Sequence, residues 1–143
     1  MPPGYSEHHT GLAADILIVG IGMAQMANTA EANWLANNSY RYGLILRYPQ
    51  GAEDITGIQF EPWHFRYVGR PHAYFMMQGG LVLEEYIEHI QNSGSFSFEK
   101  GGVTYYVLHQ ITIDGMINLP DKLDFKISSD NMGGYIVTAW REW

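Results

Sequence analysis

The segment from Glu61 to Gly69 has the sequence EPWHFRYVG, and large apolar and polar side chains alternate in it from Trp63 to Val68. Such alternation is typical of a strand with one buried face. Because successive side chains of a strand point to opposite faces, His64 and Arg66 are expected on the same face. The segment therefore predicts a strand that presents two polar groups on one side of the fold.

The segments on both sides of this strand show helical and extended patterns. A helix is predicted over residues 29–42, because Thr29 is a favoured N-cap residue and Gly43 follows at the position of a C-cap. Strands are expected at residues 16–19 and 44–48. Helices are expected at residues 71–78 and 81–91, and a turn-rich segment at residues 50–57. Asp15 is expected at the start of the first of these strands.

The pattern changes after Asn92, where short β-prone runs are separated by glycine-containing turns. The runs lie at residues 96–98, 103–113 and 135–140, and the turns at 114–115, 119–121 and 132–134. We therefore predict an α+β domain over residues 1–91 and a small β-rich C-terminal extension over residues 92–143. The aromatic residues of this extension, Tyr105, Tyr135 and Trp140, are expected to belong to its core. The alternative is that they form a sugar- or peptide-binding surface, and the role of the extension is open.

Composition excludes several classes of protein. The chain has 143 residues, 46% of them hydrophobic, which suffices for one ordinary globular domain. Its net charge of -7 and lack of any Lys/Arg cluster argue against nucleic acid as a partner. It has no cysteine, so disulfides and thiolate ligands are excluded. The longest largely apolar run, residues 16–27, is shorter than the ~20 residues of a membrane-spanning helix.

The start of the chain leads directly into a dense polar motif and carries no export signal. We therefore expect that an N-terminal part of the natural protein precedes Met1. The compartment stays open between the bacterial cytoplasm and the extracytoplasmic side of the cell envelope, and so does the oligomeric state.

Two local patterns contain residues suited to metal chemistry: SEHHTGLAAD from Ser6 to Asp15, and EPWH from Glu61 to His64. A catalytic zinc site without cysteine uses about three His and carboxylate ligands and leaves one position for water, and His8, Asp15 and His64 supply that set. Glu61 then remains as a general base. Each histidine taken singly is more often structural, and only the joint occurrence of both patterns favours the zinc site.

The two patterns also resemble a known family. Ser6-x-His8-x-x-Gly11-x-Ala13-x-Asp15 and Glu61-x-x-His64 are similar to the two signature motifs of the LAS metallopeptidases, which include D-alanyl-D-alanine carboxypeptidases and dipeptidases of the VanY, VanX and VanXY types. The block from Tyr42 to Gly69 resembles the VanY and VanXY types in particular. The resemblance implies an α+β fold with a central antiparallel sheet, related to the Hedgehog signalling domain.

The resemblance implies roles for six residues. They are zinc ligation for His8, Asp15 and His64, the general base role for Glu61, and substrate contact for Ser6 and Trp63. The implied reaction is zinc-dependent hydrolysis of the D-Ala-D-Ala bond in peptidoglycan precursors, which relates to vancomycin resistance. The family also places a substrate-binding arginine upstream of the first motif, in a helical N-terminal region that this chain is expected to lack.

Two alternatives stay open. Instead of a D,D-peptidase, the chain would be either a non-catalytic, zinc-containing module that binds cell-wall peptides, or an L,D-carboxypeptidase. Replacement of Glu61 by alanine distinguishes the enzyme from the binding module. We assign no function to the other histidines, which are His9, His72, His89 and His109.

Overall fold

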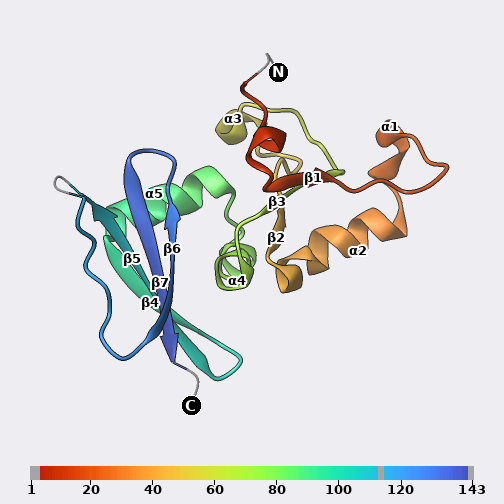
Figure 1. Cartoon of the computed structure of the whole chain (residues 1–143). Coiled ribbons are helices and arrows are strands. Elements are labelled where there is room, and N and C mark those ends of the chain that lie inside the picture. Colours follow the sequence, from red (N-terminus) through yellow and green to blue (C-terminus); the bar gives the residue numbers. More distant parts are fainter. Residues whose placement is uncertain (1–3, 113–114, 142–143) are drawn as a thin grey trace. The chain divides into compact units, whose positions relative to one another are not determined.

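The computed structural model describes residues 4–112 and 115–141 (Figure 1). The chain divides into two compact units, residues 1–84 and 85–143. The division falls inside helix α5 (Leu83–Ser93), whereas the sequence analysis placed the boundary after residue 91. Asp114 of the predicted 114–115 turn lies outside the described residues.

A three-stranded antiparallel sheet organises the first unit. Its strands are β1 (Ala13–Asp15), β2 (Leu44–Leu46) and β3 (His64–Tyr67), in the order β1-β3-β2. The central position of β3 confirms that the EPWHFRYVG segment forms a strand that organises the fold. Phe65 is fully buried on one face of β3, while His64 and Arg66 are both buried on the other.

Helices surround this sheet, and their limits follow local signals. The predicted 29–42 helix is observed as α2 (Ala30–Asn38) followed by the 3-10 turn η2 (Ser39–Tyr42). The Thr29 hydroxyl accepts a hydrogen bond from the Ala32 N–H at 3.1 Å, as expected of an N-cap. After β3 come α4 (Arg70–Gly79) and α5, which confirm the two later helices.

Gly43 ends η2 with a φ of 82°. A Cβ atom at this position would lie 2.9 Å from the Arg70 backbone nitrogen. Both the left-handed conformation and the close approach of the chain therefore require glycine here.

The prediction of a buried strand at residues 16–19 is wrong. Strand β1 ends at Asp15 instead of starting there, and Leu17 and Val19 are 51% and 100% exposed. The Ile16 N–H still bonds to the Trp63 carbonyl at 2.9 Å, but the partner chain then turns, since the His64 N–H bonds back to the Glu61 carbonyl. An apolar run cannot continue a strand when its partner bends away.

Short elements in the first unit escaped the sequence analysis. They are the 3-10 turn η1 (Glu7–Thr10) and the single-turn helices α1 (Met23–Met26) and α3 (Glu53–Thr56), the last within the segment expected to form turns. Elements of one turn carry too few residues for a periodic pattern. In the described residues, no helix has the length and apolar character needed to cross a membrane.

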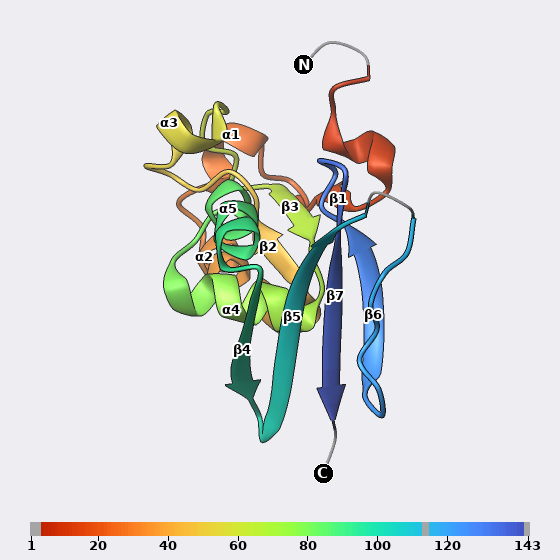
Figure 2. The same cartoon turned by 90° about the vertical axis from the view of Figure 1, so that its left-hand side faces the viewer.

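The second unit contains a four-stranded antiparallel sheet (Figure 2). Its strands run in the order β4-β5-β7-β6, with bounds β4 (Ser95–Lys100), β5 (Val103–Ile111), β6 (Asp124–Ser129) and β7 (Gly134–Arg141). The three predicted β runs correspond to β4, β5 and β7. Strand β6 was not predicted: Phe125 and Ile127 alternate with polar residues in it but form only a short apolar pattern, and all six of its residues are exposed at the sheet edge.

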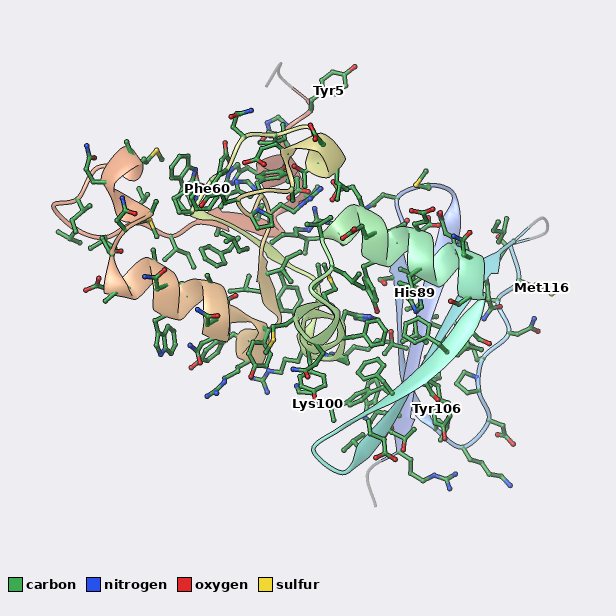
Figure 3. All side chains as sticks on the ribbon, turned by 180° about the vertical axis from the view of Figure 1, so that it is seen from behind. Tyr5, Phe60, His89, Lys100, Tyr106 and Met116 are labelled. Carbon is green, nitrogen blue, oxygen red and sulfur yellow. The ribbon has the colours of Figure 1, made fainter. Side chains whose placement is uncertain are left out.

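An aromatic row crosses one face of this sheet. The rings of Phe96, Phe98, Tyr105 and Trp140 follow one another at centroid distances of 6.3, 5.5 and 6.4 Å. His89 points from α5 toward this face and meets the Phe96 ring edge-on at 4.8 Å (Figure 3). Tyr105 and Trp140 pack in this row but stay half-buried and do not belong to the buried core, and the expectation for Tyr135 is wrong, since it is exposed on the opposite face.

Candidate metal centre

Strand register places Asp15 and His64 side by side. They are directly paired residues of the antiparallel strands β1 and β3, so their side chains leave the sheet on the same face. His8 comes from η1, which ends at Gly11 in the left-handed conformation. The Gly11 N–H bonds back to the His8 carbonyl at 3.2 Å, and this tight turn returns the chain to β1.

The three side chains converge on one point. The Asp15 Oδ1 atom lies 3.2 Å from Nδ1 of His64 and 3.4 Å from Nε2 of His8, and the three ligand atoms all lie within 4.8 Å of one another. Tetrahedral zinc with bonds of about 2.0–2.1 Å separates neighbouring ligand atoms by about 3.3–3.4 Å. The His/His/Asp donor set and the two short separations therefore fit a zinc ion.

Burial makes this site asymmetric. The His64 side chain is 5% exposed, whereas the side chains of His8 and Asp15 are 41% and 31% exposed. The His64 ring packs between the His8 ring at 4.8 Å and the Tyr48 ring at 5.0 Å. One side of the site is consequently anchored in the protein, and the other is open to water and to a substrate.

Glu61 lies beside these three residues. Its Oε2 atom is 3.7 Å from His64 Nδ1, the nitrogen that also faces Asp15. The turn from Glu61 to His64 fixes this proximity, because the His64 N–H bonds to the Glu61 carbonyl at 3.2 Å. The carboxylate is thus adjacent to the candidate ligand His64 and half-buried.

Ser6 and Trp63 both make hydrogen bonds that stabilise the local chain conformation. The Ser6 hydroxyl accepts a hydrogen bond from the His8 N–H at 3.4 Å and caps η1. The Trp63 carbonyl accepts the Ile16 N–H, which ties the chain just before β3 to the chain just after β1. Their contact with a substrate stays a prediction.

A buried charge network behind His64 was missed by the sequence analysis. The Arg47 guanidinium donates to Glu7 at 2.8 Å and to both oxygens of Glu84 at 2.6 and 2.9 Å, and Arg66 lies 3.2 Å from Glu7. Arg47 could have been noticed as a lone cation in the apolar run of residues 44–48. Nothing in local spacing pairs it with Glu7 or Glu84.

This network keeps Glu7 ionised. Burial alone would raise the pKa of Glu7, but the hydrogen bond from Arg47 and the charges of Arg47 and Arg66 outweigh burial and hold the pKa below its usual value. Burial would likewise lower the pKa of Arg47, and its bonds to Glu84 and Glu7 raise it instead. A carboxylate and two guanidinium groups therefore stand as fixed charges behind the candidate metal ligands.

An antiparallel α+β fold with an open His/His/Asp site and an adjacent carboxylate is the arrangement of a mononuclear metallopeptidase domain. Comparison with known proteins identifies the domain more closely. Residues 1–70 match the VanY family, described as D-alanyl-D-alanine carboxypeptidase, and this part of the chain belongs to that family.

Three relatives illustrate the similarity. A D-alanyl-D-alanine carboxypeptidase of Enterococcus faecium is 40% identical over 98% of this chain and 46% of its own length. The vancomycin resistance D,D-dipeptidase VanXYg, solved with a D-Ala-D-Ala phosphinate analogue, is 34% identical over 97% of this chain and 59% of its own, with a TM-score of 0.85. A variant of a VanY D,D-pentapeptidase, solved with Zn(II), is 48% identical over 59% of this chain and 46% of its own, with a TM-score of 0.52.

The extent of these matches differs. The chain spans about half the length of the relatives that it matches. The matches to the Enterococcus faecium protein and to VanXYg include nearly all of this chain, so both compact units have counterparts in them. The β-rich C-terminal part is therefore shared with these relatives.

Proposed function

We propose that the chain is the zinc-dependent catalytic part of a D,D-peptidase that hydrolyses the D-Ala-D-Ala bond of peptidoglycan precursors. The observation that carries the proposal is the convergence of His8, Asp15 and His64 at separations that fit zinc, with Glu61 beside them. The relatives support it, since one is named as a D-alanyl-D-alanine carboxypeptidase, one is solved with a D-Ala-D-Ala analogue and one with Zn(II).

In this proposal His8, Asp15 and His64 hold the zinc. Bound there, zinc acts as a Lewis acid toward a carbonyl oxygen and lowers the pKa of a coordinated water toward about 7. The exposure of His8 and Asp15 leaves that side accessible to the end of a peptide.

Glu61 acts as the proton carrier. Its carboxylate accepts a proton from the attacking water and returns it to the amine of the departing D-alanine. The Glu61 to His64 turn keeps the base and a ligand at a fixed distance, so proton transfer takes place beside the scissile bond. Ser6 and Trp63, which flank the ligands in sequence, are proposed to contact the substrate.

The biological consequence follows from the chemistry of the substrate. Removal of the terminal D-alanine from precursors deprives vancomycin of its target. We therefore propose a role in vancomycin resistance, in line with the name of the VanXYg relative.

The test is release of D-alanine by the purified chain supplied with Zn²⁺. The substrates are D-Ala-D-Ala, a pentapeptide that ends in D-Ala-D-Ala, and a tetrapeptide that ends in an L-residue followed by D-Ala. We expect hydrolysis of one or both D,D substrates. Hydrolysis of the tetrapeptide alone would identify an L,D-carboxypeptidase.

Glu61→Ala is the decisive variant. It is expected to reduce turnover about 10²–10⁴-fold, the usual contribution of a general base, while zinc content is retained. Glu53→Ala, at a carboxylate in α3 that takes no part in the site, is the matched control. Zinc binding without hydrolysis of any of the three peptides by the wild-type chain would instead support the peptide-binding module.

A further inference from the structure

His64 has a second buried nitrogen that the proposed reaction does not use. Its Nδ1 faces Asp15 and Glu61, while its Nε2 points the opposite way, 3.5 Å from Glu7 Oε2. Within the described part of the chain, neither His64 Nε2 nor Glu7 Oε2 has a hydrogen-bond partner of good geometry, and both atoms are buried. Their separation exceeds the usual hydrogen-bond range by about 0.3 Å, so a small closure joins them.

Glu7 is held in place from its other side. Its Oε1 atom accepts Arg47 Nε at 2.8 Å and lies 3.2 Å from Arg66 NH1. Arg47 is itself fixed by its two bonds to Glu84. Because both guanidinium groups engage Oε1, the carboxylate is oriented with Oε2 toward His64.

We propose that Glu7 is a positioning residue for the metal centre. It accepts the Nε2–H of His64, which commits the lone pair of Nδ1 to the metal and fixes the plane of the ring. Carboxylates that accept the second N–H of a ligating histidine act in this way and typically change metal affinity 10–100-fold. The proposal rests on the zinc site of the proposed function, and its statement about the His64 tautomer can be tested without zinc.

Glu7 lies in η1, the same turn that contains the candidate ligand His8. Glu7 and His8 are consecutive, and the 3-10 turn directs the His8 side chain to the open side of the site while Glu7 is turned inward. One turn therefore supplies a candidate ligand and the support for the opposite ligand.

Glu7→Gln separates positioning from mere structural support. The side-chain amide has almost the same shape, and its oxygen is retained by Arg47 and Arg66, which are donors only. Its NH₂ group then faces His64 and donates to Nε2, which favours the tautomer with hydrogen on Nδ1. The Arg47 anchor survives, but the nitrogen that should bind the metal becomes protonated.

The control is Glu84→Gln, which weakens the ion pair between residue 84 and Arg47 and does not contact His64. For wild type and both variants we would measure three quantities. They are the ¹⁵N chemical shifts of His64 in the metal-free protein at slightly alkaline pH, the Zn²⁺ dissociation constant by chelator competition, and the thermal unfolding midpoint of the metal-free protein.

We expect Glu7→Gln to change the His64 tautomer from Nε2–H to Nδ1–H and to weaken Zn²⁺ binding about 10–100-fold. Glu84→Gln should leave the His64 tautomer and the Zn²⁺ affinity near their wild-type values, even if it lowers the unfolding midpoint as much as Glu7→Gln does. Wild-type tautomer and zinc affinity in Glu7→Gln, or equal losses in both variants, would overturn the proposal. If the tautomer changes as expected but wild type hydrolyses no D,D peptide, the positioning role stands and the proposed function fails.

Discussion

Within residues 4–112 and 115–141, two clusters pair histidine with aspartate, one in each compact unit, and they differ in how completely their hydrogen-bonding capacity is used. In the first, His8 and His64 lie 3.4 and 3.2 Å from Asp15, whose side chain is 31% exposed. In the second, His109 lies 2.8 Å from Asp130, and the Asp130 side chain is 2% exposed.

The hydrogen-bond acceptor positions of the Asp130 carboxylate are occupied by donors of the protein itself. Besides His109, it accepts the N–H groups of Met132 and Gly134 at 2.8 Å each and a longer bond from Gln91 at 3.5 Å. It thereby closes the turn between β6 and β7. Asp15 has two imidazole neighbours, and within the described residues no backbone N–H bonds to its carboxylate, so its oxygens remain available to a metal ion.

A histidine next to a carboxylate is therefore not enough to define a metal site. A closed cluster stabilises the fold, because each lone pair already has a donor. An open cluster keeps atoms that are free to coordinate an added ion.

The largest expected effect is on zinc binding. His64→Ala removes a proposed ligand and should weaken Zn²⁺ binding more than about 100-fold, beyond the range typical of supporting residues. His109→Ala should leave the Zn²⁺ dissociation constant unchanged, because the second cluster has no open position. Chelator competition on both variants measures this, and an equal loss of affinity in the two would erase the proposed distinction.

The next effect is on stability. Asp130→Ala leaves His109 and two backbone N–H groups without their buried acceptor and should lower the free energy of unfolding by about 3 kcal/mol. Asp15→Ala in the metal-free protein should change it by no more than about 0.5 kcal/mol, as at other exposed positions. Urea denaturation provides both values. A larger loss for Asp15→Ala would mean that the open cluster is structural.

The smallest effect concerns pH. Burial alone would raise the pKa of Asp130, but the bonds from His109, Met132 and Gly134 outweigh it and lower the pKa to about 2. A depression of this size stabilises the folded state by about 2 kcal/mol. Since the folded pKa lies below that of an unfolded aspartate, about 3.9, the stabilisation is complete above that pH and is lost as the pH falls toward 2.

Amide hydrogen exchange of β5 and β7 measures this effect. Their protection should decline between about pH 4 and pH 2 in the wild-type chain, and Asp130→Asn should lack that part of the decline. An identical pH dependence in the variant would show that Asp130 does not provide the acid-sensitive stabilisation.

Much of the fold could be predicted from local signals. The Thr29 cap and Gly43 delimited the helical segment, and the alternation in EPWHFRYVG identified the central strand. Predictions failed where the formation of a strand depends on a partner strand that is distant in the sequence. Residues 16–19 have strand-forming side chains but no paired chain beyond Trp63, and the edge strand β6 is held by its pairing with β7 while its two large apolar side chains stay exposed.

For the site, the two ordered motifs alone identify His8, Asp15, His64 and Glu61 as candidates for metal chemistry, without any coordinates. The register of β1 and β3, which sets Asp15 opposite His64, follows only from the folded chain. The same holds for Glu7, which faces the second nitrogen of His64, and for Asp130, which closes on His109. The physical reason is that strand register and the partners of buried charges depend on contacts between residues distant in the chain, which no local spacing encodes.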